Sequence, residues 1–553
     1  MKCKSFWKLP VLFAVIGSVI GCSSSQKGDR YSDGTGWDLS GKEGGTKYQT
    51  DYEDQEPGPG LILVEGGTYT MGKVQDDPMK DWNNTPTQQH VQSFYIDEHE
   101  VTNVMYLEYL DWLKKTFPPS ESNFKNIYYG ALPDTLVWRN PLGFNENMTN
   151  NYLRHPASQN YPVVGVTWLQ AVEFSKWRTD RVNEKKLEQE KYTGEEARFN
   201  SESGSVFSTE TYINSPTQVY GGDEEKLLGG KNSEDKGYQD ENGEQRDKFV
   251  QLKDGILLPD YRLPTESEWE YAALGQSSIR DYNSYRGRKK YPWDGQYTRS
   301  NNRKTLGDQK ANFKQGTGDY GGIAGWSDDG AAITTQVMSY EPNDYGLYDM
   351  AGNVAEWVAD VYRPIIDNEF NDFNYYRGNS YTKNVINDDG TVKVLDPTEV
   401  VYDTLANGKI VATNLPGEIK KQALGEEETY LRTQFDESYN VDYRDGDQES
   451  SIYFDQTNVE VKNKMYNSPE NEISVDPNTG EMVRNRDKSD DRTTLIDDEV
   501  RVYKGGSWRD RAYWLDPAQR RYYPQHMSTD FIGFRNAMSR VGSKSGQKGR
   551  SRK

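Results

Sequence analysis

The stretch NDYGLYDMAGNVAEWVAD, residues 343–360, says more about the fold than any other part of the sequence. Its glycines, asparagines and carboxylates alternate with large apolar side chains, without the period of 2 typical of a strand or of 3.6 typical of a helix. Such a segment can bury aromatic side chains while its carbonyls and acids contact another group. That group could be a substrate, a metal ion or the remainder of a protein core.

The composition of the whole chain indicates an aromatic-rich protein with little regular structure. Only 34% of its 553 residues are hydrophobic, and the mean hydropathy is -0.97. The 39 Tyr, 17 Phe and 13 Trp compensate, because each can bury a large area and still keep a polar group satisfied. We expect one irregular domain with long polar insertions. The net charge of -21 argues against a nucleic-acid partner and leaves cations, a protein partner or simple solubility open.

Residues 1–21 have the pattern of a lipoprotein signal peptide. Three lysines precede the apolar run 11–20, which is too short to span a membrane as a mature helix. Residues 19–22, VIGC, resemble a bacterial lipobox, which implies cleavage before Cys22 and diacylation of its sulfur, with fatty acids such as palmitate. More than one acyl chain would give stable anchoring. The alternative is an ordinary secretory signal followed by a chance cysteine.

The cysteine content restricts the redox chemistry of the chain. Cys3 and Cys22 are its two cysteines. The first would leave with the signal peptide and the second would carry lipid. The mature chain would then contain neither a free thiol nor a disulfide, although it would lie in an oxidising compartment.

Residues 22–57 are rich in Ser, Gly and Asp and predict a flexible tether. Two stretches after this tether predict strands near the start of the domain. Residues 58–72, GPGLILVEGGTYTMG, alternate apolar and polar side chains on both sides of Gly66 and Gly67, which predicts a hairpin. Residues 91–96 continue with the apolar spacing of a strand.

Three helices are predicted from the residues that would begin them. Thr102 is expected to cap a helix over residues 105–117. The sequences TWLQ, from Thr167, and TESE, from Thr265, have the spacing of capping boxes. Each precedes aromatic and small apolar residues that would share one helix face.

Long polar stretches separate these predicted elements. A domain over residues 58–540 would carry insertions at about 185–255 and 363–498, both rich in charged residues, Asn and Gly. Stretches of this length in a compact domain are either functional or disordered. Residues 541–553 form a basic tail, opposite in sign to the body. It could dock on an acidic partner, on acidic headgroups or back on the protein itself, or it could be merely solvated.

Nine motifs in a fixed order make up a family resemblance. They are GGTYTMG, HEVTN, PVVGVTWLQAVEFSKW, YRLPTESEWEYAA, YPWD, ANF, NDYGLYDMAGNVAEWV, KGGSW and GFR. In this order they resemble the formylglycine-generating enzyme, or sulfatase-modifying factor, family. The resemblance implies a compact α+β fold with little regular secondary structure, related to C-type lectins.

The same resemblance implies two structural calcium sites. The positions of the first are Asp349, Gly352, Val354 and Glu356, and those of the second are Asn312, Phe313, Asp329 and Ala331. Acid and amide side chains would supply some oxygens and backbone carbonyls the others, which suits calcium because it takes six to eight oxygen ligands. The alternative is that Asp349 and Glu356 accept hydrogen bonds from backbone N–H groups and cap turns.

The oxidase activity of the family depends on two cysteines after the GGS motif that bind copper. The matching positions here are Asp510 and Leu515. Copper(I) prefers soft thiolate ligands, so neither side chain fits, and we expect no copper and no catalytic residues. The four histidines, His90, His99, His155 and His526, also lack the helical spacing of a related iron site.

Two further stretches, residues 85–120 and 513–525, resemble gliding-motility lipoproteins of Bacteroidota. The resemblance implies a non-catalytic, lipid-anchored outer-membrane protein that faces the periplasm and assembles with other gliding and type IX secretion proteins, as a homo- or hetero-oligomer. The alternatives are a ring-forming paralogous lipoprotein of the same secretion system, a divergent oxidoreductase and a carbohydrate-binding lipoprotein.

Overall fold

The computed structural model describes fourteen segments of the chain, which are residues 31–32, 34–39, 54–73, 84–139, 145–193, 206–223, 226–227, 249–275, 289–315, 329–362, 382–423, 471–475, 482–486 and 499–542. The predicted signal peptide, Cys22, much of the predicted tether and residues 543–553 of the basic tail lie outside these segments. No helix in the described part of the chain is both long and apolar enough to cross a membrane.

The chain divides into two units. In the smaller unit, which includes residues 1–54 and 251–255, Tyr31 and Asp38 form an antiparallel bridge, and the short helix η5 covers Leu252–Asp254. The larger unit covers residues 55–250 and 256–543 and contains all the other elements described below.

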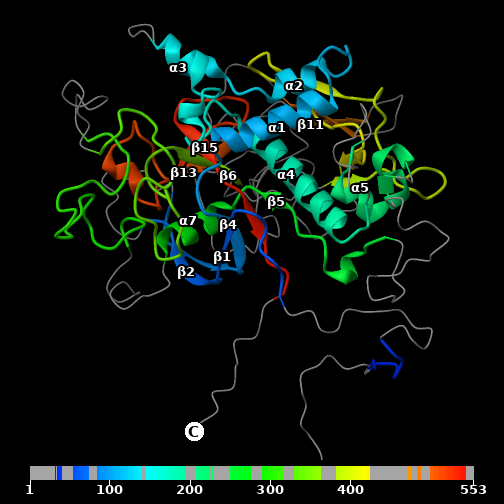
Figure 1. The fold of residues 1–553 in the computed structure, drawn as a ribbon, viewed down its shortest axis with the longest axis horizontal. Helices are drawn as coiled ribbons and strands as arrows, with labels where there is room; N and C mark the ends of the chain where they lie inside the picture. The colour runs from blue at the N-terminus through cyan, green and yellow to red at the C-terminus, as the bar shows by residue number, and fades with distance from the viewer. Residues whose placement is uncertain are drawn as a thin grey trace, which may run out of the picture. The chain divides into compact units, whose positions relative to one another are not determined.

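Two four-stranded sheets form the centre of the larger unit. The first is antiparallel and has the order β1 (Leu61–Val64), β4 (Phe94–Asp97), β16 (Ala537–Ser539) and β5 (Tyr261–Arg262). The second has the order β14 (Arg521–Pro524), β13 (Val500–Lys504), β6 (Ala355–Val361) and β15 (Ile532–Phe534), in which β15 runs parallel to β6. Only Arg535 and Asn536 separate β15 from β16, so these two residues connect the sheets (Figure 1).

Eight further strands form two-stranded sheets. The pairs are β2 (Gly67–Met71) with β3 (Thr87–Val91), β7 (Thr382–Asn384) with β10 (Lys421–Ala423), β8 (Tyr402–Thr404) with β9 (Ile410–Ala412), and β11 (Asn471–Val475) with β12 (Met482–Arg486). The α-helices are α1 (Asn103–Thr116), α2 (Lys125–Ala131), α3 (Glu146–Asn151), α4 (Trp168–Gln189), α5 (Thr209–Asn214) and α7 (Glu266–Leu274). Short 3-10 turns are η1 (Thr135–Trp138), η2 (Pro156–Ser158), η3 (Pro216–Gly222) and η9 (Ala512–Leu515).

Both predicted capping boxes are confirmed. Thr167 begins α4 by accepting a hydrogen bond from the Gln170 N–H, and the Gln170 side chain accepts one from the Thr167 N–H. Thr265 and Glu268 make the same reciprocal pair at the start of α7. Thr102 does precede α1, but its side chain makes no capping hydrogen bond.

The predicted hairpin around Gly66 and Gly67 is wrong. β1 pairs with β4, whereas β2 pairs with β3, so the two halves of the expected hairpin belong to different sheets. A Cβ at Gly66 would lie 2.4 Å from the Val91 carbonyl oxygen. The chain therefore bends against residues 91–93, and the two strands pair with residues 16 to 36 positions away. Alternation could identify these strands but not their partners.

Aromatic side chains join the helices to the second sheet. Tyr106 of α1 stacks on Phe174 of α4, with ring centroids 5.6 Å apart, and Phe174 meets Phe534 of β15 edge to face at 5.4 Å. Trp357 of β6 is fully buried in the same cluster. The predicted α+β fold with little regular secondary structure is confirmed, because short elements are held together by aromatic contacts rather than by extended sheets.

Parts of the two predicted insertions form a layer beside these helices. Residues 382–423, yellow in Figure 1, reach α2, where the Lys409 Nζ donates to the Leu132 carbonyl at 2.6 Å. They also reach α5, where the Thr211 hydroxyl donates to the Gly417 carbonyl at 2.8 Å. Gly417 has a φ of +90°, and a Cβ there would lie 3.0 Å from the Val206 carbonyl oxygen. Two described parts of the insertions, residues 206–223 and 382–423, thus contact each other.

Candidate functional site

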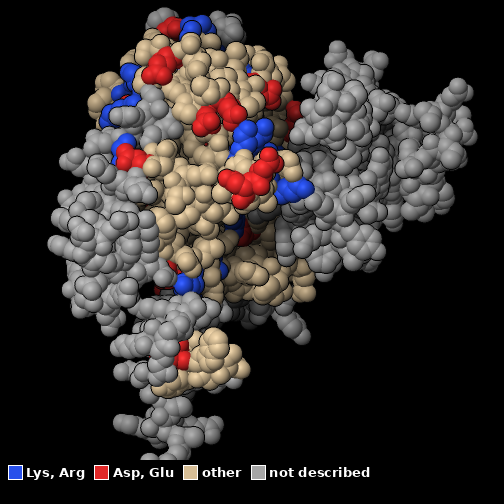
Figure 2. Space-filling view, turned by 90° about the vertical axis from the view of Figure 1, so that its right-hand side faces the viewer, with Lys and Arg blue, Asp and Glu red and all other residues tan. Residues whose placement is uncertain are grey.

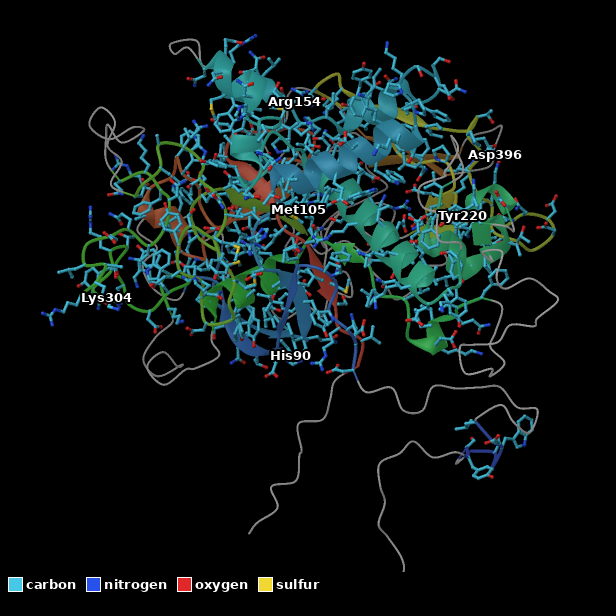
Figure 3. The ribbon with its side chains drawn as sticks, viewed as in Figure 1. His90, Met105, Arg154, Tyr220, Lys304 and Asp396 are labelled. Atoms are coloured by element: carbon cyan, nitrogen blue, oxygen red, sulfur yellow. The ribbon has the colours of Figure 1, made fainter. Side chains whose placement is uncertain are left out.

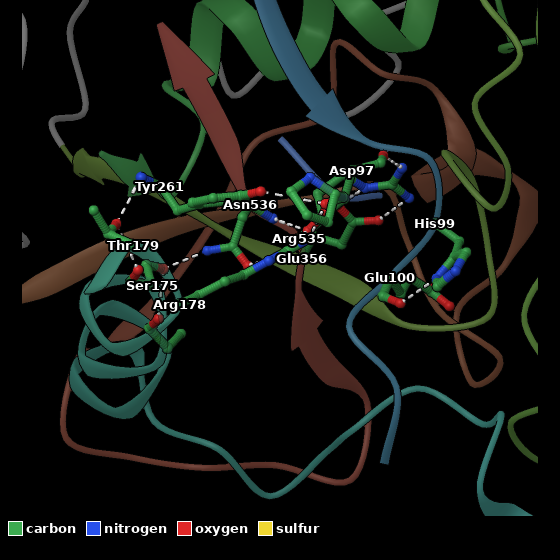
Figure 4. A network of polar contacts seen from close by, with 12 residues as sticks. Asp97, His99, Glu100, Ser175, Arg178, Thr179, Tyr261, Glu356, Arg535 and Asn536 are labelled. Atoms are coloured by element: carbon green, nitrogen blue, oxygen red, sulfur yellow. Dashed lines mark hydrogen bonds and ion pairs between the residues drawn. The ribbon is translucent and has the colours of Figure 1, made fainter. Parts of the chain in front are cut away.

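A network of buried polar side chains lies where the two sheets meet (Figure 4). Arg535 is fully buried and donates from Nε to Glu356 Oε2 at 2.6 Å and from Nη2 to Glu356 Oε1 at 2.7 Å. Its remaining donors reach the carbonyls of Asp97, at 3.2 Å, and Tyr348, at 2.9 Å. Trp269 of α7 donates to Glu356 Oε2 at 2.7 Å. Each charge in this pair therefore has several partners, as a buried ion pair requires.

The network continues from the sheets to α4 through a second guanidinium. Arg178 donates to Asp97 Oδ2 at 2.8 Å, to Asn536 Oδ1 at 3.2 Å and to the Pro59 carbonyl at 2.8 Å. The Asn536 N–H donates to the same Asp97 oxygen at 2.8 Å, and its side-chain amide donates to the Ser175 hydroxyl. Both residues that connect β15 to β16 are thus fixed by hydrogen bonds: Arg535 to Glu356, and Asn536 to Asp97 and Arg178.

Asn353 links the opening segment of the sequence to this network. It is buried and has a φ of +56°, a region that Asn enters more readily than most residues. Its amide nitrogen donates to Glu100 Oε2 at 2.7 Å, and its amide oxygen accepts from the Thr335 N–H at 2.9 Å. Its backbone N–H donates to the Asn312 carbonyl at 2.9 Å. Glu100 also accepts from the Val354 N–H at 3.1 Å.

The carboxyl groups of Glu100, Asp349 and Glu356 lie near the Arg535 guanidinium, so acidic groups exceed basic groups at this site. Burial raises the pKa of Glu100 well above its usual range, and the nearby acids Asp349 and Glu356 raise it further, while Arg535 opposes the shift. Burial likewise raises the pKa of Asp349 to about 6, against the hydrogen bond from the Met338 N–H and the charge of Arg535. The site therefore favours protonation or an additional cation.

The four positions of the first predicted calcium site extend from the irregular residues 349–354 into the start of β6, where Glu356 lies. Asp349 has a φ of +57° and accepts from the Met338 N–H at 2.8 Å. Gly352 has a φ of +81°, and a Cβ there would lie 2.4 Å from the Asn312 carbonyl oxygen. The hydrogen bond to Asp349 is of the kind that the turn-capping alternative requires.

Glu356 fits the predicted calcium site less well than Asp349 does. Both of its oxygens already accept from Arg535, and one also accepts from Trp269. A calcium ion there would share this carboxylate with a guanidinium. Asp349 and the adjacent buried Glu100 remain suitable oxygen donors in charge and type. Calcium at this segment stays a prediction.

The four positions of the second predicted site also lie together. Asp329 accepts from the Phe313 N–H at 3.1 Å through Oδ2 and from the Ala331 N–H at 3.2 Å through Oδ1. The Asn312 amide donates to the Ile333 carbonyl at 2.7 Å. Asp329 thus binds the backbone N–H groups of Phe313 and Ala331, the two residues whose carbonyls are the expected calcium ligands. Calcium at this second site also stays a prediction.

Asp510, at one position where the resemblance expects a copper ligand, is engaged in an ion pair. Its two oxygens accept from the two terminal nitrogens of Arg521, each at 2.7 Å, and one also accepts from the Ser507 hydroxyl at 2.5 Å. The guanidinium carbon of Arg521 lies 4.7 Å from the ring centroid of Tyr503 and 4.6 Å from that of Trp514. Aromatic rings therefore cover a pair that is itself mostly buried.

Leu515, at the other position, is part of a small apolar cluster. Its side chain is fully buried among the cluster residues Tyr291, Ala311, Phe313 and Ala351. An ion-paired carboxylate and a packed leucine supply neither of the thiolates that copper(I) prefers.

Three of the four histidines have separate, local side-chain contacts. His90 lies 3.3 Å from the Thr68 hydroxyl, His99 lies 2.7 Å from the Glu100 carbonyl, and His155 accepts from the Ala157 N–H at 3.1 Å. Within the described segments, no three His, Cys, Asp or Glu side chains are grouped to hold a metal ion.

Comparison with known proteins gives the family. The model of the sulfatase-modifying factor enzyme 1-like domain matches residues 44–393, more than half of the chain. This chain belongs to that family. Strands β13 to β16 lie beyond the matched range and complete both central sheets, so the folded unit extends past residue 393.

Individual relatives of the sulfatase-modifying factor family match shorter parts of the chain. The serine/threonine-protein kinase pkn1 of Chlamydia pneumoniae is 24% identical over 319 residues, which are 56% of this chain and 30% of the relative. The formylglycine-generating enzyme of Thermomonospora curvata is 38% identical over 99 residues, which are 18% of this chain and 27% of that enzyme. The inactive C-alpha-formylglycine-generating enzyme 2 of Mus musculus is 36% identical over 104 residues, 19% of this chain and 27% of the relative. The chain thus spans less than a third of the length of these proteins.

Solved structures superpose only loosely on this member of the family. PvdO from Pseudomonas aeruginosa is 14% identical with a TM-score of 0.35, and the match covers 87% of this chain and 94% of that one. CarF is 14% identical with a TM-score of 0.33, and the match covers 87% and 97% of the two chains.

Sequence reasoning named the motifs of the family but missed several residues that organise the site. Glu100 and Asn353 stand inside the quoted motifs HEVTN and NDYGLYDMAGNVAEWV, and neither was singled out. Lys504, also in a motif, is fully buried between Glu266, at 3.1 Å, and Glu270, at 3.0 Å. For Lys504 the available signal was its place as the one charged residue of KGGSW, because a charged residue is rarely buried without a partner. Glu100 and Asn353 stand among other polar residues of their motifs, so no such signal distinguished them.

Proposed function

We propose that this protein is a non-catalytic outer-membrane lipoprotein, similar to the gliding-motility lipoprotein GldJ of Bacteroidota, and that it is a structural or assembly component of the gliding and type IX secretion machinery. The observation that carries the non-catalytic part is the pairing of Asp510 with Arg521 and the burial of Leu515. Two relatives that are named inactive C-alpha-formylglycine-generating enzyme 2 support a non-catalytic role, because similar sequences occur in proteins described as inactive.

The proposed mechanism is scaffolding. Acyl chains on Cys22 would hold the folded unit at the periplasmic side of the outer membrane, and residues 22–57 would give it reach. We call residues 206–223 and 382–423 the insertion layer. This layer enlarges the surface of the folded unit without adding a catalytic motif, so contact with other subunits is the role that we propose for it. Crosslinking in intact cells would separate this role from that of the ring-forming paralogue by identifying the captured chains.

A pair of assays tests the proposal. Purified, unacylated protein incubated with a thiol peptide, copper and oxygen should show no turnover, with an active formylglycine-generating enzyme as the positive control. In cells, Cys22→Ser should abolish gliding and type IX secretion, whereas Asp510→Asn and Leu515→Met should leave both intact at equal protein levels. Catalytic turnover of the peptide, or normal gliding of the Cys22→Ser strain, would contradict the proposal.

A further inference from the structure

A hairpin outside the buried network projects from the larger unit. We define it as residues 297–310 and call it the basic hairpin. Its strands are tied by the Lys310 N–H to the Thr298 carbonyl at 2.9 Å and the Ser300 N–H to the Asp308 carbonyl at 2.8 Å. The Gly307 N–H closes the tip on the Ser300 carbonyl at 3.0 Å. The hairpin is therefore a bonded structure that holds its side chains in place.

Aromatic packing fixes the base of the basic hairpin to the core. Trp293 stacks on the buried Tyr291 with ring centroids 5.0 Å apart and donates from its indole nitrogen to the Tyr297 carbonyl at 2.9 Å. Tyr291 belongs to the same apolar cluster as Leu515. Just before it, Lys289 is buried and paired with Asp344 at 2.9 Å. The hairpin thus stands on a rigid support.

The charge of the basic hairpin is opposite to that of the protein. Its four basic residues, Arg299, Arg303, Lys304 and Lys310, exceed its one acid, Asp308, and leave a net charge of +3 in a chain of net charge -21. Arg303, Lys304 and Lys310 make no ion pair with any residue that the structure describes. Lys304 points away from the body at the edge of the molecule (Figure 3).

The face of the molecule opposite to Lys304 has a different distribution of charge. On the face shown in Figure 2, which looks from the side opposite to Lys304, basic and acidic side chains lie beside one another in small mixed groups. That face therefore differs from the basic hairpin, where four basic residues accompany one acid, Asp308.

Large apolar side chains accompany the cations on the basic hairpin. Tyr297 is 80% exposed and Leu306 is 72% exposed, one at the base and one at the tip. Exposed apolar groups interleaved with Lys and Arg are typical of segments that lie at a membrane surface, where the cations meet anionic headgroups and the apolar groups enter the boundary region.

We propose that the basic hairpin docks the protein on a membrane surface that carries anionic headgroups. The role of the basic hairpin would differ from that of the proposed acyl chains on Cys22. The acyl chains would tether the folded unit to the membrane, whereas the hairpin would set its orientation there. Each of the three unpaired cations should strengthen binding about fivefold, so that neutralising all three should weaken it roughly 100-fold. Salt should weaken it as well, because exposed charges are screened.

Vesicle sedimentation tests the proposal. The unacylated chain that begins at residue 22, with Cys22→Ser, would be mixed with phosphatidylglycerol–phosphatidylethanolamine vesicles and, separately, with neutral phosphatidylcholine vesicles. The test variant is Arg303→Gln/Lys304→Gln/Lys310→Gln, and a second variant is Tyr297→Ser/Leu306→Ser. The matched control, Lys115→Gln/Lys125→Gln/Lys185→Gln, removes three exposed lysines from the helices.

The expected result is binding to the anionic vesicles alone, with a loss of at least tenfold in both hairpin variants and less than twofold in the control. Equal binding to neutral vesicles, or equal losses in the hairpin and control variants, would overturn the proposal and would leave a docked acidic protein as the better explanation of the charge. Because the assay uses unacylated protein, such a failure would not bear on the proposed lipid anchor, which the gliding phenotype of Cys22→Ser tests separately.

Discussion

The network around Arg535 and the layer built from the two insertions satisfy their charges in different ways. Arg535 and Glu356 are fully buried and make several hydrogen bonds each. In the insertion layer, Glu418 is partly exposed and accepts one hydrogen bond, from the Leu415 N–H at 3.0 Å, while the Lys421–Glu210 pair is more than 40% exposed on both sides. The first arrangement joins two sheets, whereas the second attaches a surface layer, and we expect their energies to differ accordingly.

The largest expected effect comes from breaking the buried pair. Arg535→Met would leave the Glu356 carboxylate buried without its counter-charge, which costs about 3–5 kcal/mol. Urea unfolding should show this loss, and Arg535→Met/Glu356→Gln should recover part of it. The matched control is Arg139→Met, which removes an ion pair from the surface and should have no measurable effect. Equal stability of the Arg535 and Arg139 variants would refute the comparison.

Calcium is the next test, because the excess of carboxylates near Arg535 would accept a further cation. If Asp349 and its neighbours hold calcium, the ion should add about 2.7 kcal/mol at a concentration one hundred times its Kd. Thermal unfolding with calcium and with a chelator would measure this, and Asp349→Asn should remove most of the difference. Asp111→Asn, on an exposed face of α1, is the control. An unchanged melting temperature would reject calcium and favour the turn-capping alternative.

The smallest expected effect lies in the insertion layer. Burial raises the pKa of Glu418 from 4.5 to about 7, so folding favours its protonated form. Its stabilising contribution is complete below about pH 4.5 and lost as the pH rises through 7. Glu418→Gln should flatten this dependence and stabilise the layer at pH 8 by about 1–2 kcal/mol, less than the full shift implies because part of the carboxyl group meets water.

Hydrogen exchange of the amides in residues 409–421 would measure the stability of this layer as a function of pH. Lys421→Ala is the matched variant, since it removes the exposed pair with Glu210 and should change protection by no more than about 0.5 kcal/mol at any pH. A layer whose protection rises between pH 4.5 and 7 in the wild-type chain would show that Glu418 does not control it.

Several local features could be read from the sequence because their causes are local. The capping boxes at Thr167 and Thr265 depend on residues three positions apart, and both formed as predicted. The nine motifs in their fixed order indicated the family, and two of them contain Gly352 and Gly505, whose positive φ few other residues adopt readily. The strands could be recognised but not paired, as the wrong hairpin at residues 66–67 shows.

By itself the sequence determined the family, the starts of α4 and α7, the absence of cysteine at 510 and 515 and the unequal distribution of charge, since each depends on residue identity or on neighbours a few positions away. Tertiary structure alone decided that Arg535 meets Glu356 from 179 positions away, that Arg521 neutralises Asp510, and that the two insertions contact each other. Burial makes an unpaired charge costly, so the partner of each charge is fixed by what packs beside it, and the chain order does not contain that information.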